Sequence, residues 1–220
     1  MNIKLLLRSK LNNKIVFIRK AFTYKDKFKL LDVGSGNGSA TKIKSLFNFC
    51  EYFGLDIDKT TNYVSRDFEL MEKFYEMDLT KLDFEEIPNA YFDYINMAHV
   101  MEHLHNGDLV LQGLLQKLKP GGYFYIEYPG DRSLDLPSMN GTLNFYDDST
   151  HVRIYSVSET EAIFLNNNCE VISSGTRKNW YCIAAIPFRL LHNLFTWKKP
   201  SGNTFWDLLG FAEYVFVKRN

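Results

Sequence analysis

Cysteine is scarce in this chain, with three among 220 residues. Cys50, Cys169 and Cys182 form no C-x-x-C pair, and two of them fall in apolar runs that are typical of strands. This pattern disfavours a cysteine metal site and a disulfide framework, and it predicts buried free thiols in a reducing compartment. We therefore expect a cytoplasmic protein.

A long apolar run and an excess of charge of one sign are missing as well. The opening residues are apolar for only a few positions before Arg8, which is too short for a secretory signal or a membrane helix. The 26 basic and 26 acidic side chains cancel, so no overall field steers the protein toward nucleic acid. We expect no transmembrane segment and no nucleic-acid partner.

Apolar residues are plentiful, and their order is informative. They make up 45% of the chain, which is enough for one domain with a full core at this length. Strand-like and helix-like segments alternate up to about residue 175. Such alternation predicts a mostly parallel sheet.

The first strand of this series ends in a glycine-rich turn. The apolar run Leu30–Val33 contains Asp32 and breaks into glycines at alternate positions, Gly34, Gly36 and Gly38. Glycine lacks a Cβ, so it permits positive φ and lets the backbone approach a ligand closely. With a helix expected over 39–47, this unit is typical of a nucleotide-binding α/β sheet.

Further motifs follow in a fixed order. A second apolar run over 51–58 ends in acids about twenty positions after Gly36, and a third over 74–77 ends at Asp78. A fourth strand over 91–97 leads into Glu102-His103-Leu104. A helix then runs into Leu118-Lys119-Pro120-Gly121-Gly122, which precedes a strand over 123–127.

Together these motifs resemble the class I S-adenosylmethionine-dependent methyltransferases. The likeness is strongest to the branch with Glu-His-Leu after strand four and Leu-Lys-Pro-Gly-Gly before strand five. It covers roughly 29–177 and 211–218. It implies a Rossmann-like α/β fold, with a seven-stranded, doubly wound, mostly parallel sheet and an antiparallel last strand beside strand five. It also implies methyltransferase activity, with S-adenosylmethionine as cofactor.

On this basis we expect a single methyltransferase domain over 1–220. It would consist of an N-terminal basic helical segment (1–28), a cofactor-binding core (29–178), an aromatic helical insertion (179–210) and a final strand (211–218). The basic segment is expected to lie beside the cofactor mouth. Within the core, a helix is expected to start at Ser158 with a capping box to Glu161.

The resemblance assigns the methionine half of the cofactor to the glycine turn. The backbone of the turn would pack against this half, and Asp32 would face its ammonium group. The alternative for Asp32 is a loop cap. The turn residues concerned are Gly34, Ser35, Gly36, Asn37 and Gly38.

The adenosine half is assigned to the ends of the next strands. Asp56 would accept hydrogen bonds from the ribose hydroxyls, with Asp58 as its rival, and Ile57 would pack on the adenine. Asp78 with Leu79 would address the adenine edge, although Asp78 also suits a helix N-cap.

The pocket near the transferred methyl group is assigned to the end of strand four. The resemblance places Asn96, Met97 and Ala98 along its wall. His99 follows directly, and a neutral imidazole is a competent base near pH 7, although it could equally orient the loop.

The acceptor side has two further candidates. His151 and Tyr155 fall in the stretch that usually covers the acceptor in this family. We list both with His99 as candidate catalytic residues.

Motifs that are absent from the sequence narrow the possible classes of methyl acceptor. The chain lacks an Asn-Pro-Pro-aromatic tetrapeptide after strand four and a Pro-Cys nucleophile. It has no compelling cluster of oxygen ligands, so we expect no metal. Small molecules, sugars and lipid-linked acceptors remain. Two other functions stay open: a non-catalytic cofactor-binding or interaction module, and a nicotinamide-dependent oxidoreductase, which the serine at position 39 disfavours.

The aromatic insertion is longer than a plain connection between strands requires. It contains Trp180, Trp197 and Trp206, the three tryptophans of the chain, and Pro187 is expected to open or bend its helix. A lid, a homodimer or partner surface and a peripheral membrane contact compete with ordinary packing against the sheet edge.

Overall fold

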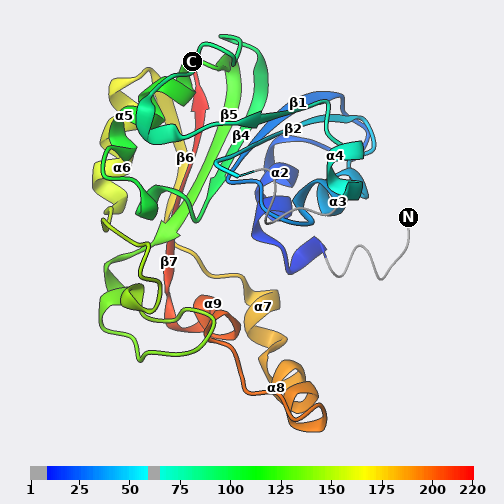
Figure 1. Cartoon of the computed structure of the whole chain (residues 1–220), viewed down its shortest axis with the longest axis vertical. Coiled ribbons are helices and arrows are strands. Elements are labelled where there is room, and N and C mark those ends of the chain that lie inside the picture. The colour runs from blue at the N-terminus through cyan, green and yellow to red at the C-terminus, as the bar shows by residue number, and fades with distance from the viewer. Residues whose placement is uncertain (1–8, 59–64) are drawn as a thin grey trace.

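The computed structural model describes residues 9–58 and 65–220. They form a seven-stranded sheet in the order β3-β2-β1-β4-β5-β7-β6. The pairs from β3 through β5 are parallel, and β7 runs antiparallel to both β5 and β6. The expected doubly wound sheet, with its antiparallel last strand inserted beside strand five, is confirmed (Figure 1).

Each expected strand is present, with ends that differ by a few residues. The largest difference concerns β5, which begins at Leu118 rather than at residue 123, because the Pro-Gly-Gly segment continues the strand through a register shift opposite β4. The strands are β1 (Phe28–Val33), β2 (Cys50–Asp56), β3 (Lys73–Glu76), β4 (Phe92–Ala98), β5 (Leu118–Pro129), β6 (Cys169–Thr176) and β7 (Ala212–Arg219).

Helices cover both faces of the sheet (Figure 1). One apolar core joins the sheet to α5 and α6, and a second joins it to α2 and α3. The helices are α2 (Asn13–Ala21), α3 (Ser39–Lys44), α4 (Ser65–Glu69), α5 (Gly107–Leu115), α6 (Val157–Asn166), α7 (Trp180–Ala184), α8 (Ile186–Phe195) and α9 (Trp206–Leu209).

Within the described residues, the expected basic N-terminal helix is interrupted: helical residues end at Lys10, and α2 begins anew at Asn13. The Asn12 side chain caps it by accepting from the Ile15 amide. Phe17 anchors it to the sheet by stacking on Tyr125 with ring centroids 4.0 Å apart. Helix α2 therefore lies against the sheet, and Lys14 faces the end of β1.

The capping box of α6 lies two residues earlier than expected. Ser156 accepts from the Glu159 amide, and the Glu159 carboxylate accepts from the Ser156 amide. The sequence contains two overlapping Ser-x-x-Glu patterns, and the earlier one is used because it buries Thr160, whose hydroxyl accepts from Tyr128 at 2.7 Å. Glu161 instead accepts from Ser174 of β6.

The aromatic insertion leaves the sheet after β6 and returns at β7. As expected, Pro187 stands at the start of α8, where a missing amide hydrogen costs nothing. Helix α8 extends away from the sheet (Figure 1). Its outer face is exposed, with Phe188 at 74% and Phe195 at 79%.

The cysteines and helices bear on two further expectations. Cys50, Cys169 and Cys182 are free and buried, as expected. Across 9–58 and 65–220, no helix combines the length and apolarity needed to cross a membrane.

Candidate functional site

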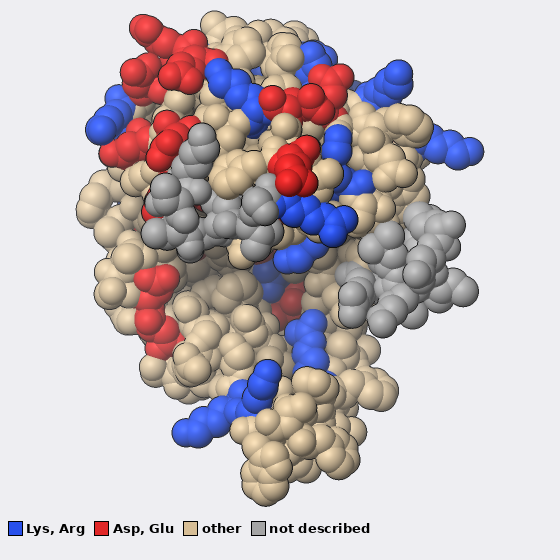
Figure 2. All heavy atoms as spheres, turned by 45° about the vertical axis from the view of Figure 1, so that its right-hand side comes forward, with Lys and Arg blue, Asp and Glu red and all other residues tan. Residues whose placement is uncertain are grey.

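A cavity of about 510 Å³ opens at the carboxyl ends of β1, β4 and β5. In the sheet order, β1 and β4 are the neighbours at which the chain reverses its direction of winding, which is where α/β sheets bind ligands. The opposite wall comes from α2, α7 and α9. Figure 2 shows a hollow in this side of the molecule with Lys and Arg side chains around it.

The glycine turn forms one end of the cavity through Ser35 and Asn37. Gly34 has φ +63°, and a Cβ there would stand 2.2 Å from a methyl carbon of Val100. The Gly34 amide donates to the Leu55 carbonyl at 2.8 Å. The turn is thus closed onto β2 with no room for a side chain at its first glycine.

Asp67 of α4 holds the far side of the same turn, and sequence analysis missed it. Its buried carboxylate accepts from the Gly38 amide at 2.6 Å and from the Thr41 amide at 3.1 Å. Two amides at the start of α3 are satisfied in this way. No local pattern in the sequence connects Asp67 to a turn 29 residues away.

The end of β2 lies against the glycine turn. Asp56 accepts from the Gly36 amide at 3.3 Å and from the Ile57 amide at 2.8 Å. The Ile57 side chain is 66% exposed at this edge. Their assignment to ribose and adenine stays a prediction.

At the end of β3, Asp78 is an N-cap, which is the alternative to its assignment to the adenine edge. One carboxylate oxygen accepts from the amide and the hydroxyl of Thr80, so Asp78 caps the following turn. These bonds lower the pKa of Asp78. Leu79 is buried in the core below it.

Asp32 departs from the expected role. Its carboxylate is fully buried, and Lys14 of α2 holds it at 2.9 Å. Its remaining partners are Ser39, Tyr52 and Asn96. The ammonium group of Lys14 lies against the carboxylate to which the resemblance assigned the cofactor's ammonium, because α2 packs across this edge of the sheet.

The side chains of the three residues assigned to the end of β4 lie in three different environments. Ala98 lines the cavity, whereas Asn96 is fully buried and donates to Asp32 at 2.5 Å. Met97 points into the core on the other face of the sheet, because successive side chains of a strand alternate between faces. The Met97 side chain therefore does not line the pocket.

His99 lies on the cavity wall between two carboxylates. Its Nε2 is 2.9 Å from Glu127 and its Nδ1 is 3.3 Å from Glu102. Burial opposes protonation, but the two carboxylates outweigh it and raise the pKa of His99 to about 9. An imidazolium carries a proton on each nitrogen and has no free lone pair, so this setting argues against the expected role as a base.

The floor of the cavity is a buried ionic network that sequence analysis missed. Arg177 contacts Glu127 at 2.6 Å and donates to both oxygens of Asp207. Burial opposes ionisation of Glu127, and the cations Arg177 and His99 nevertheless lower the pKa of Glu127 to about 2. The network connects β5, the residue that follows β6, and α9 beneath Trp206. The ring centroid of Trp206 lies 4.7 Å from that of His99.

Tyr155 does not line the cavity. Tyr155 is 1% exposed. Its hydroxyl donates to the Leu104 carbonyl at 2.6 Å and accepts from the Gly107 amide at 3.1 Å. Both capacities of the hydroxyl are used in packing α5, so the structure contradicts a catalytic role.

A second cavity of about 250 Å³ adjoins the first and shares His99 and Trp206 with it. His151 lines it together with Glu102 and His103. These three residues could hold a metal ion. The expectation of no metal overlooked this group, because His151 is far from Glu102 and His103 in sequence.

Residues 7–174 match a family model described as "Methyltransferase domain". The chain belongs to this methyltransferase family. The expected class I resemblance is confirmed. Membership in a methyltransferase family argues against the alternative of a nicotinamide-dependent oxidoreductase.

Solved methyltransferases share the fold. The S-adenosylmethionine-dependent methyltransferase of Mesorhizobium loti is 12% identical, with a TM-score of 0.62 over 94% of this chain and 98% of that chain. Phosphoethanolamine N-methyltransferase 2 of Haemonchus contortus, in complex with S-adenosylmethionine, is 18% identical, with a TM-score of 0.63 over 94% and 51% of the two chains. The putative methyltransferase complexed with the Trm112 activator of Haloferax volcanii is 15% identical, with a TM-score of 0.61 over 88% and 83%.

A curated relative matches a shorter stretch. This uncharacterised protein of Synechococcus is 30% identical over 103 residues, which are 44% of this methyltransferase and 24% of the relative. The chain thus spans about a quarter of the length of the curated relative it matches.

Proposed function

We propose that this methyltransferase moves a methyl group from S-adenosylmethionine to a small-molecule acceptor held beside His99 and Trp206. One observation carries the proposal: a single cavity of about 510 Å³ is lined by Ser35 and Asn37 at one end and by His99 and Trp206 at the other. Donor and acceptor can therefore occupy one space.

The donor half of the proposal uses the strand ends. Asp56 receives the ribose hydroxyls, and the backbone of the glycine turn packs against the methionine part. Lys14, whose side chain is 20% exposed on the cavity wall, takes the carboxylate of the methionine part by charge attraction. This contact replaces the one that the resemblance assigned to Asp32.

The transfer itself requires mainly alignment. The carbon–sulfur bond of the sulfonium breaks with its electron pair left on sulfur, a bond forms from the acceptor lone pair to the methyl carbon, and the acceptor releases a proton. The reacting atoms must be held about 3–3.5 Å apart and in line. In this account His99 orients the Trp206 ring as a positioning residue, because Glu102 and Glu127 engage both of its nitrogens.

Transfer from a donor with a labelled methyl group tests the proposal. The protein is incubated with labelled S-adenosylmethionine and with phenols, amines, nucleotide sugars or lipid extracts. We expect label in one acceptor class, and far less with Asp56→Ala. Donor binding without transfer to any class would favour the non-catalytic module instead.

We also propose that α8 contacts an anionic membrane surface. Its outer face aligns Phe188, Leu191 and Phe195 at helical spacing, all more than half exposed. No acid occurs between Val171 and Trp206. Arg189 and the exposed pair Lys198 and Lys199 supply cations beside the apolar face.

This combination suits a helix lying in the headgroup region of a membrane. Figure 2 agrees, because the lower end of the molecule, where α8 lies in Figure 1, has blue but no red side chains on the visible face. A homodimer through the same face is the outcome that would replace this proposal.

A further inference from the structure

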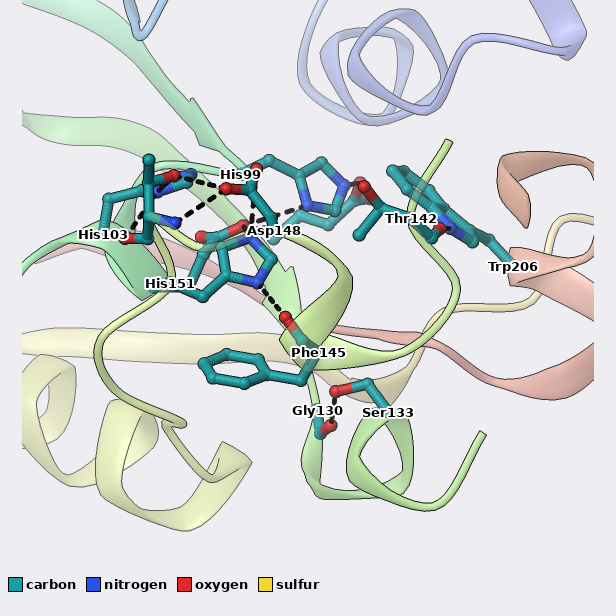
Figure 3. Close-up of polar contacts among 12 residues, drawn as sticks. His99, His103, Gly130, Ser133, Thr142, Phe145, Asp148, His151 and Trp206 are labelled. Carbon is teal, nitrogen blue, oxygen red and sulfur yellow. Dashed lines mark hydrogen bonds and ion pairs between the residues drawn. The ribbon is translucent and has the colours of Figure 1, made fainter. Parts of the chain in front are cut away.

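The second cavity contains a group of side chains to which the proposed transfer assigns no ligand. Glu102 and His103 stand on the 3₁₀ turn Met101–His103, directly after β4, and His151 comes from the loop before α6. The ligand atoms that these three residues offer lie within 4.8 Å of one another. Figure 3 shows the rings of His103 and His151 side by side, with centroids 4.9 Å apart.

The carboxylate of Glu102 is the first sign of a missing partner. Glu102 is 1% exposed, and its Oε2 is buried without a hydrogen-bond partner. Its other oxygen is shared by His99 at 3.3 Å and His151 at 3.9 Å. A buried carboxylate oxygen without a donor destabilises the fold, and a cation that contacts this oxygen removes that penalty.

The hydrogen-bond pattern of His151 fixes which nitrogen carries its proton. Nδ1 lies 2.7 Å from the Phe145 carbonyl, which can only accept, so Nδ1 donates. In the neutral ring Nε2 then keeps its lone pair, and it lies 3.9 Å from the Glu102 carboxylate.

His103 is arranged in the same way. Its Nδ1 lies 2.9 Å from the Thr150 hydroxyl oxygen and 3.2 Å from the Thr150 carbonyl. The Thr150 hydroxyl itself donates to Asp148 at 2.6 Å, so Nδ1 of His103 is the donor here too. A metal-ligating histidine usually donates the N–H of its other ring nitrogen to an acceptor such as a backbone carbonyl.

We propose that Glu102, His103 and His151 bind a divalent transition-metal ion. Two imidazole nitrogens and one carboxylate are the ligand set of open zinc sites and related transition-metal sites, whereas calcium and magnesium prefer oxygen alone. Asp148 has an oxygen 3.9 Å from His151 Nε2 and stands beside the site. Three protein ligands leave at least one coordination position for another molecule.

The open position gives the site a role that rests on the proposed methyl transfer. The two cavities share His99 and Trp206, so an acceptor in the first cavity is close to an ion in the second. Such an ion favours an acceptor with a hydroxyl group, because a bound hydroxyl loses its proton to water more readily. The sulfonium methyl then forms its new bond with that oxygen, and the ion changes neither charge nor oxidation state.

Titration of metal-stripped protein tests the site without any methyl donor. Co²⁺ is added while visible absorption is recorded, and Zn²⁺ binding is measured by calorimetry. We expect one ion per chain and an absorption band typical of Co²⁺ with nitrogen and oxygen ligands. Glu102→Gln and His151→Ala should each weaken binding at least tenfold.

His105→Ala is the matched control, because His105 is exposed on the same segment and offers its backbone carbonyl, not its ring, to Arg153. It should bind the ion as the wild type does. Glu102→Gln preserves the size of the side chain, and circular dichroism confirms that each variant is folded.

Two results would overturn the site: absence of binding, or equal binding by the wild type and His151→Ala. The transfer role is tested separately by locating the methyl group in the product. Saturable ion binding together with a methyl group on nitrogen or carbon would uphold the site and refute its assignment to an acceptor oxygen.

Discussion

Gly34 is the turn residue at which a side chain meets the most serious obstacle. A Cβ would stand 2.2 Å from Val100, and φ is +63°. Gly121 has φ +78° with no atom within 4 Å of its hypothetical Cβ, so it reports the backbone strain alone. We expect Gly34→Ala to lower the free energy of unfolding by at least about 1 kcal/mol more than Gly121→Ala does. Urea denaturation measures both, and equal losses would show that Val100 moves aside freely.

Asp56 and Asp58 are the two candidates for the ribose contact, and substituting each in turn distinguishes them. Asp56 touches the glycine turn through the Gly36 amide. A charge-assisted contact to two hydroxyls predicts that Asp56→Ala weakens S-adenosylmethionine binding by about tenfold or more. Asp58→Ala should leave the dissociation constant almost unchanged in the same calorimetric titration. The reverse result would transfer the ribose contact to Asp58.

The sequence indicated which residues surround the site better than what each one does. The glycine turn and Ala98 lie where the motifs predict. Asp32 could not be foreseen, because its partner Lys14 belongs to a helix outside the recognised core. Tyr155 was misassigned because its hydroxyl partners, Leu104 and Gly107, are distant in sequence.

Among the helices, α6 offers a direct comparison of two serines. Ser156 accepts from the Glu159 amide at 3.2 Å as the N-cap, whereas Ser158 follows inside the first turn. Loss of such a cap costs about 1 kcal/mol. Thermal or urea unfolding should show this loss for Ser156→Ala and a much smaller change for Ser158→Ala. A larger loss from Ser158→Ala would restore the capping box expected from sequence.

The exposed apolar face of α8 and the cations beside it predict that the protein binds selectively to anionic vesicles. Sedimentation should recover the protein with vesicles that contain phosphatidylserine and leave it in solution with phosphatidylcholine alone, because both charge and apolar area contribute. Lys198→Glu/Lys199→Glu should abolish binding, and Lys25→Glu/Lys27→Glu, outside α7–α9, should not. A stable dimer in solution without vesicle binding would contradict the membrane proposal.

Element identity was predictable where periodicity was strong. Strands β1 to β5 were expected from apolar runs, and β7 was expected beside β5 through the family resemblance. Boundaries failed where two signals overlapped, as in the paired Ser-x-x-Glu patterns before α6. The destination of α8 was left open, because an apolar stripe alone does not distinguish a buried face from an exposed one.

At the scale of the whole molecule, function depends on contacts between segments that are remote in the chain. Glu127, Arg177 and Asp207 join three elements below Trp206. Glu102 and His103 meet His151 in the second cavity. Neither group forms a compact motif, so the sequence predicted the donor side of the site through its motifs and left the acceptor side undetermined.

The central claim is that one cavity receives the donor along the glycine turn. A crystal structure of the protein with S-adenosylhomocysteine tests it most directly. We predict the homocysteine part beside Ser35 and Asn37, the ribose on Asp56, and the sulfur facing the part of the cavity that His99 and Trp206 line. A cavity that stays empty at saturating ligand, or a ligand bound elsewhere, would contradict this account.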